Sequence, residues 1–310
     1  MPQADLSAAP IDDAYGASPH DASDAHDAHW QPPRWRDALA RLAANRLAVA
    51  GVVIIALAVF VSLAAPWLAP YDPNHAEPAA RLGGVGTPGH WLGLDAQGRD
   101  MTSRLLWGGR TSLAIVVVSV LGACVASLAL GLYAGYSRGL AAIAVMRATD
   151  LLFAFPMILL AINLATAFGA GPFTAGVTVL FSALPYLTRV VYANVRAERE
   201  REYVEAARAL GASTFDIVAR EILPNVLTPL VVYGTTLCGG MIVFLAGLSY
   251  LGLGVQPPMP DWGRMVSEGA KVMLTGGAHV ATLPALAIVA VSVAFNWLGD
   301  GLRDALDPQG

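Results

Sequence analysis

The sequence predicts an all-α integral membrane protein with six transmembrane helices, because of its composition and the spacing of its charges. Hydrophobic residues make up 55% of the 310 residues and charged residues only 14%, whereas a typical soluble domain carries about 25% charged residues. Asp, Glu, Lys and Arg are absent from five stretches, each longer than the roughly 18 apolar residues that indicate a span. These stretches are 47–71, 111–137, 151–188, 225–260 and 272–299. This composition argues against a soluble enzyme, a nucleic-acid-binding protein and a secreted disulfide scaffold.

The first three stretches predict four helices. About 20 helical residues cross the hydrocarbon core, so we expect a first helix over Leu47–Ala65, closed by Pro66, and a second that ends near Gly135. The 38 residues of 151–188 are too many for one crossing. The Gly-Ala-Gly-Pro segment at 169–172 breaks this stretch into a hairpin of two helices.

The last two stretches predict one helix each. The fifth helix lies within 225–260 and is ended by the glycines and prolines of 252–258, and the sixth lies near Leu283–Leu298. None of the stretches shows the period-2 alternation of transmembrane β-strands, so helices are favoured throughout.

The basic residues orient these helices, because cytoplasmic loops carry an excess of Arg and Lys. With the N-terminus inside, thirteen arginines fall on the inner side: Arg34, Arg36, Arg41, Arg46, Arg138, Arg147, Arg189, Arg196, Arg199, Arg201, Arg208, Arg220 and Arg303. Six basic residues fall on the outer side: Arg81, Arg99, Arg104, Arg110, Arg264 and Lys271. The ratio predicts that both termini lie in the cytoplasm.

The N-terminal segment differs from the rest of the chain. Its first 29 residues contain six Asp and no Arg or Lys. Such a segment cannot bury enough apolar surface to order itself, so we expect residues 1–35 to form a disordered acidic cytoplasmic tail. A metal site at His20, His26 and His29 is less favoured than a solvated tail. Residues 36–110 then hold the first transmembrane helix and a long periplasmic loop.

The sequence offers neither catalytic residues nor a metal site. A phosphate-binding P-loop needs Gly-x-x-x-x-Gly-Lys-Ser/Thr, but the single lysine, Lys271, is followed by Val272. Any ATP-driven work therefore needs another subunit. Ser249 lies between Gly247 and Gly252 at a spacing that differs from a nucleophile turn and favours close helix packing. The two cysteines fall inside predicted spans and are expected to act as small apolar side chains: Cys124 and Cys238.

Ionisable residues are scarce within the predicted spans. Only Arg147 and Asp150 approach one, and they can pair on one helix face because they are three residues apart. Ion-coupled transporters usually place such groups deeper along the path, so their scarcity argues against a secondary transporter. Substrate-binding residues are not assigned, and the candidates for a polar transport path, each more often a packing residue, are Asn163, Thr166, Tyr233 and Asn296.

Residues 194–224 form a cytoplasmic loop between the fourth and fifth helices. Its Glu, Ala, Arg and Leu content favours helix. We expect a first short helix that runs to about Leu210 and ends because Gly211 takes the left-handed conformation. Ser213 is a suitable N-cap for a second short helix, which is expected to stop before Pro224.

These two short helices can act as a unit. Phe215, Val218 and Ile222 are spaced to share one face of the second helix. On the first helix, Ala206 and Ala207 form a smooth patch. Such a pair can seat in a groove on a partner and pass rigid-body motion to the spans. An amphipathic loop lying on the membrane accounts for the spacing equally well.

The same loop resembles the EAA loop of ABC importer permeases. The resemblance rests on Glu205, Ala206, Ala207, Gly211, Ile222, Leu223 and Pro224. The general pattern has an isoleucine three residues before the proline, where this sequence has Glu221. That departure agrees with the peptide/nickel subfamily. In this family the loop forms the coupling helix that docks on the ATP-binding subunit.

Four further segments are similar to the same family and follow in order along the chain: 92–113, 153–156, 251–263 and 296–304. The long loop after the first helix indicates the second permease type of dipeptide, oligopeptide or nickel importers. The resemblance implies a type I ABC importer transmembrane domain fold over residues 111–303. Its coupling loop is 194–224, and a C-terminal tail, 304–310, follows.

The resemblance also implies a function and partners. The chain would be a permease subunit of an ATP-driven importer in the bacterial inner membrane, moving peptides or a related small solute such as nickel or glutathione. Its partners would be a second, different permease, two ABC ATPase subunits and a periplasmic or lipid-anchored substrate-binding protein. ATP would be used by the ATPases, and this chain would bind no cofactor. The alternative is a stand-alone secondary transporter or channel.

Overall fold

The computed structural model describes residues 35–306, and these are helical over most of their length. The helices are α1 Trp35–Ala44, α2 Arg46–Leu63, α3 Ala65–Leu68, α4 Met101–Tyr136, α5 Leu140–Ala154, α6 Met157–Phe168, α7 Pro172–Arg199, α8 Glu202–Ala209, α9 Thr214–Asp216, a π-helical turn Ile217–Ile222, α10 Leu223–Tyr250, α11 Trp262–Ala270 and α12 Ala278–Leu306. Short 3₁₀ turns lie at Pro78–Ala80 and Met273–Thr275. Apart from residue 35, the predicted acidic tail and its three histidines lie outside the described residues.

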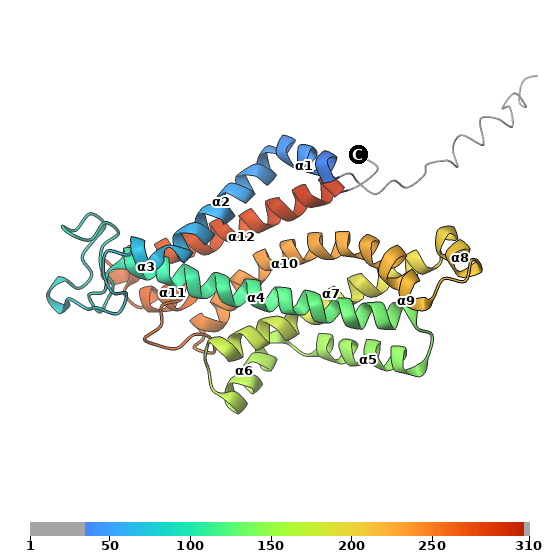
Figure 1. The fold of residues 1–310 in the computed structure, drawn as a ribbon. Helices are drawn as coiled ribbons and strands as arrows, with labels where there is room; N and C mark the ends of the chain where they lie inside the picture. The colour runs from blue at the N-terminus through green and yellow to red at the C-terminus, as the bar shows by residue number, and fades with distance from the viewer. Residues whose placement is uncertain (1–34, 307–310) are drawn as a thin grey trace, which may run out of the picture.

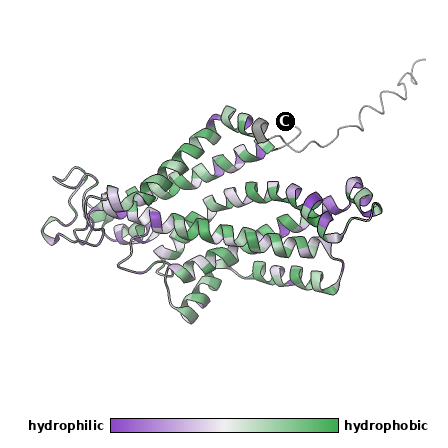
Figure 2. Cartoon of the chain, in the orientation of Figure 1, coloured by the Kyte–Doolittle hydropathy of each residue, from purple (hydrophilic) through white to green (hydrophobic). Residues whose placement is uncertain are grey.

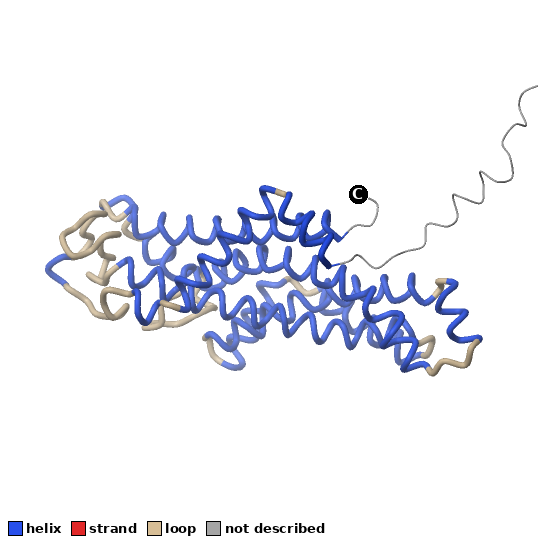
Figure 3. Tube along the Cα trace, turned by 45° about the horizontal axis from the view of Figure 1, so that its top comes forward, coloured by secondary structure: helices blue, strands red, loops and turns tan. Residues whose placement is uncertain are grey.

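The helices form an elongated bundle. The long loop between α3 and α4 lies at one end, and α8 and α9 lie at the other (Figure 1). α1 packs against the end of α12, where Asn45 Nδ2 lies 3.5 Å from Asp304 Oδ2. Most loop residues gather at the opposite end of the bundle (Figure 3). The two ends of the described chain therefore lie on the same side of the membrane, as an even number of crossings requires.

Five of the described helical segments are long and apolar enough to cross a membrane, and the bent pair α5–α6 can supply a sixth crossing. Hydrophobic residues cover the length of the bundle, whereas hydrophilic residues gather towards its two ends, around α8 and α9 and near α11 (Figure 2). The predicted all-α membrane fold is confirmed, and the predicted count of six is reached when α5 and α6 are taken as one broken span.

The third span is not the continuous helix that we expected. α5 begins at Leu140, ends at Ala154, and is bent by 93° from α6. Pro156 lacks an N–H and disfavours the helical conformation in the residue before it. Phe155 is accordingly extended, with φ −78° and ψ 127°. The predicted break at 169–172 is present, because α6 ends at Phe168 and α7 begins at Pro172.

The second span begins earlier than we expected, at Met101 instead of 111. Its start is set by Asp100, whose carboxylate accepts a hydrogen bond from the backbone N–H of Ser103 at 2.7 Å. This is the arrangement of a helix N-cap. Arg104 and Arg110 thus belong to a helix and not to the outer loop in which we counted them.

A buried ion cluster explains how α4 accommodates Arg104. Arg104 Nη2 lies 3.0 Å from Glu268 Oε2 of α11, and Arg99 Nη2 lies 2.6 Å from the same oxygen. Arg99 Nε also lies 2.6 Å from Asp95 Oδ2. Charges are tolerated in a protein interior when they are paired in this way. The cluster joins the outer loop to the ends of α4 and α11.

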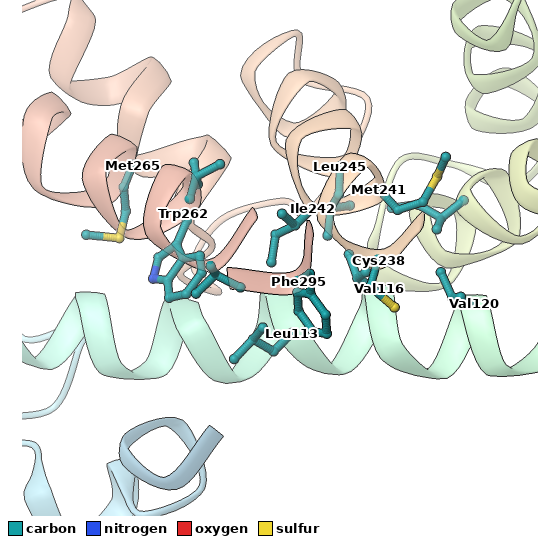
Figure 4. Close-up of a cluster of buried hydrophobic side chains, with 14 of the residues drawn as sticks. Leu113, Val116, Val120, Cys238, Met241, Ile242, Leu245, Trp262, Met265 and Phe295 are labelled. Carbon is teal, nitrogen blue, oxygen red and sulfur yellow. The ribbon is translucent and has the colours of Figure 1, made fainter. Parts of the chain in front are cut away.

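A hydrophobic core holds α4, α10, α11 and α12 together. Leu113 and Val116 of α4 lie opposite Ile242 and Leu245 of α10, with Phe295 of α12 beside them (Figure 4). All five side chains are buried. Ala175 and Val179 of α7 also belong to this core. The later part of α7 forms a second cluster with α8 and the π-helical turn, described below.

Small residues bring α4 and α7 into close contact. A Cβ atom on Gly131 would lie 2.5 Å from Val191 Cγ1, and one on Gly135 would lie 2.7 Å from Val195 Cβ. Such small residues let transmembrane helices approach closely, because lipid gives no hydrophobic drive for their association.

We predict that Gly131→Val lowers the stability of the folded chain by about 1–3 kcal/mol, because the added atoms overpack the α4–α7 contact. Thermal unfolding of the purified transporter in detergent measures this as a lower midpoint. Gly240→Ala is the matched control, because a Cβ atom there meets nothing within 4 Å. An unchanged midpoint for Gly131→Val would contradict the packing described here.

Candidate coupling site

The loop between α7 and α10 begins with the short helix α8, which ends in a Schellman motif. The Gly211 N–H donates to Arg208 O at 3.1 Å, and the Ala212 N–H donates to Ala207 O at 3.0 Å. This pair of bonds requires a left-handed residue after the helix. Gly211 supplies it with φ +84°. The predicted glycine bend is confirmed.

The chain turns back into a second helical segment at Ser213. Its hydroxyl oxygen accepts a hydrogen bond from the Asp216 N–H at 3.1 Å, which confirms the predicted N-cap. The expectation that this segment stops before Pro224 is wrong, because α9, the π-helical turn and α10 run on without a break from Thr214 to Tyr250. The Leu223 N–H donates to Val218 O, five residues back. The following proline then lies in the first turn of α10, where its missing N–H costs little.

Three aliphatic side chains anchor the loop to the spans. Val204 of α8 and Ile217 and Ile222 of the π-helical turn are almost completely buried. They pack in one cluster with Val195 of α7 and Val226 of α10. The two isoleucines are five residues apart, which matches the wider turn of a π-helix. α8 is therefore fastened to both neighbouring spans by buried apolar contacts.

A polar contact adds to this anchor. The Tyr203 hydroxyl donates to the Glu198 carboxylate at the end of α7, and Asn225 Nδ2 donates to the Tyr203 oxygen at 2.9 Å. Partial burial, together with the bond to Glu198, raises the pKa of Tyr203 to about 12. The phenol thus stays protonated near neutral pH, so this bond joins α7, α8 and α10 under physiological conditions.

The surface that α8 and α9 present to solvent is partly apolar. Leu210 is 89% exposed and Phe215 is 78% exposed. Glu205 and Ala206 are also exposed, whereas Ala207 is turned partly into the buried cluster. The expectation that Phe215 and Ile222 share one face is wrong, because Phe215 is exposed and Ile222 is buried. The patch of Ala206 and Ala207 stays a prediction, with Ala207 only partly exposed. Exposed apolar patches are typical of surfaces that contact another protein or the membrane.

The other predicted polar groups are occupied locally. Asn163 Nδ2 donates to Leu159 O at 2.8 Å, and the Thr166 hydroxyl donates to Ile162 O at 2.8 Å. Asn296 Nδ2 donates to Ser292 O at 2.9 Å, all within one helix. Tyr233 packs edge-on against Tyr186, with ring centroids 6.0 Å apart.

The predicted pair of Arg147 and Asp150 is present but loose, at 3.8 Å. Asp150 has a closer partner in Arg189 of α7, at 2.7 Å. Ser249 is buried where Gly254 approaches it closely, which agrees with a packing role. Residues 35–306 contain no group of three or more His, Cys, Asp or Glu that could hold a metal ion.

Two family models match the sequence. The model described as "binding-protein-dependent transport system inner membrane component" matches residues 127–309. The model described as "N-terminal TM domain of oligopeptide transport permease C" matches residues 34–83. Together these matches take in the candidate loop and the first two described helices.

Similar curated proteins span almost the whole chain. The glutathione transport system permease protein GsiD of Pectobacterium atrosepticum is 42% identical over 275 residues, which cover 89% of this chain and 91% of that protein. GsiD of Escherichia coli O6:K15:H31 is 41% identical over 275 residues, which cover 89% of this chain and 90% of that protein.

A solved structure supports the fold. A chain of the inward-facing MetNI methionine ABC transporter superposes with a TM-score of 0.55 at 22% sequence identity. The match covers 67% of this chain and 98% of the MetNI chain. This likeness confirms the predicted transmembrane domain fold.

We predict that Val204→Ala loosens α8 from the spans, because it removes two buried methyl groups worth about 0.8 kcal/mol each. A loss of about 1.5 kcal/mol corresponds to roughly tenfold more frequent local opening. Hydrogen exchange of the amides of residues 202–210 measures it. Leu210→Ala is the control, since that side chain is exposed. Equal exchange in the two variants would refute the anchoring role of Val204.

Proposed function

We propose, from the premise that this chain belongs to the family of binding-protein-dependent transport system inner membrane components, that it couples ATP hydrolysis by separate subunits to solute import. The chain is a multi-pass permease of the bacterial inner membrane and not the ATPase. The single observation that carries the coupling role is the burial of Val204, Ile217 and Ile222 against α7 and α10. Because of this contact, we expect α8 to move together with α7 and α10.

The exposed surface of the same loop supports ATPase subunits as partners. The ATPase subunits would contact the tip formed by Glu205, Ala206, Leu210 and Phe215, and closing of the ATPase pair would displace α8. The coupling residues are those of the predicted loop: Glu205, Ala206, Ala207, Gly211, Ile222, Leu223 and Pro224. ATP is bound by the partners, and this chain has no ATPase activity and binds no cofactor.

The remaining partners lie in and above the membrane. A second, different permease subunit would complete the translocation path. In support of this, the candidate path residues Asn163, Thr166 and Asn296 each bond within their own helix. A periplasmic or lipid-anchored binding protein delivers the solute. The curated relatives are glutathione permeases, so we propose glutathione or a short peptide as the solute.

Reconstituted uptake tests this function. We expect vesicles that hold the chain with its second permease, ATPases and binding protein to accumulate labelled glutathione or dipeptide only when ATP is supplied to the ATPase side. Vesicles with the chain alone should take up none. Uptake by the chain alone, without nucleotide, would instead establish the alternative of a stand-alone transporter or channel.

We predict that Gly211→Val uncouples ATP hydrolysis from uptake. A Cβ atom at Gly211 meets nothing within 4 Å, so the cost is the left-handed backbone, about 1–2 kcal/mol for a residue other than glycine. Uptake and solute-stimulated ATPase activity should both fall while the complex still assembles. Gly211→Asn is the control, because asparagine tolerates this conformation. Normal coupling in the valine variant would contradict the role of the bend.

A further inference from the structure

A polar cavity lies at the cytoplasmic end of the bundle, beside the start of the coupling loop. Its volume is about 410 Å³. It opens between the end of α4, the turn at 137–139, the inner face of α5 and the last turns of α7. Its charged lining residues are Arg138, Arg147, Asp150, Arg196, Arg199 and Glu200.

The acids around the cavity leave most of this positive charge unpaired. Asp150 forms an ion pair with Arg189 at 2.7 Å and a longer one with Arg147 at 3.8 Å. Within residues 35–306, no carboxylate lies within ion-pairing distance of Arg138, Arg196 or Arg199. The cavity therefore has an excess of cations.

Arg199 is the most informative of these arginines, because its side chain is only 9% exposed. Its Nη1 donates to Tyr136 O at 2.8 Å and to Gly135 O at 3.3 Å, the last carbonyls of α4. Carbonyl dipoles hold the guanidinium in place but do not neutralise it. A buried cation is costly unless an anion accompanies it, and the cavity beside it can hold one.

The setting of the cavity indicates which anion it holds. It lies where the spans α4 and α7 end on the predicted inner side. The ends of transmembrane helices reach the headgroup region of a bilayer. α5 runs along the side of the bundle, whereas α8 lies at the end of the bundle (Figure 1). Leu140 of α5 is 85% exposed, and Ile143 beside the cavity is more than half exposed. An acyl chain would cover these side chains while its phosphate enters the cavity.

We propose that this cavity binds the phosphate headgroup of an anionic phospholipid from the cytoplasmic leaflet. Basic pockets between transmembrane helices on this side of a membrane suit such headgroups. Arg199 and Glu200 lie just before α8, so a headgroup bound to the cavity would stabilise the start of the coupling loop.

Lipid binding to the assembled transporter tests the proposal. Native mass spectrometry of the complex, titrated with phosphatidylglycerol or phosphatidylcholine, should show tighter binding of phosphatidylglycerol. In Arg138→Gln/Arg196→Gln this preference should fall by about fivefold for each arginine lost. Both side chains are solvent-accessible and outside the packed cluster, so the fold should persist. Arg220→Gln removes a cytoplasmic arginine outside the cavity and should retain the preference.

Three results would overturn the proposal. Equal affinity for the two lipids, or an equal loss in the Arg220→Gln control, would show that no lipid-selective site exists here. Displacement of phosphatidylglycerol by an equal concentration of inorganic phosphate would identify a site for a soluble anion. Loss of the ATPase subunits from the double variant would identify the cavity as part of the ATPase docking surface.

Discussion

The arrangement of the cytoplasmic end depends on one contact, the burial of Val204, Ile217 and Ile222 between α7 and α10. A loop of this length would otherwise be free to hinge between its two spans. The buried side chains, with the Tyr203 bonds beside them, convert it into an extension of both helices. A force applied at Leu210 or Phe215 must then act on the spans, which is what an importer driven by separate ATPases requires.

Features set by local chemistry could be predicted from the sequence. Charge-free stretches located the spans because lipid excludes ionised side chains. Gly211 and Ser213 were assigned correctly because a left-handed bend and an N-cap each depend on one residue type. The break before Pro172 followed from the same kind of reasoning.

Features set by distant partners could not be predicted in this way. Arg104 was assigned to a loop because nothing near it in the sequence reveals Glu268, which pairs with it from α11. Pro224 was expected to end a helix, but the π-helical turn before it lets the chain continue into α10. Phe215, which was expected to share a face with Ile222, is exposed. Pro156 is a local signal for the bend between α5 and α6. We nevertheless expected one continuous helix there, because Pro156 lies within a long apolar stretch.

The distance between α8 and α10 tests the central claim most directly. Spin labels at Glu202→Cys of α8 and Val231→Cys of α10, with Cys124 and Cys238 replaced by alanine, can be measured by pulsed electron resonance in the complete transporter. If α8 and α10 move as one body, the distance distribution stays the same in the nucleotide-free and ATP-trapped states. A shift of several ångströms between these states would show that α8 hinges independently, and the coupling account would be wrong.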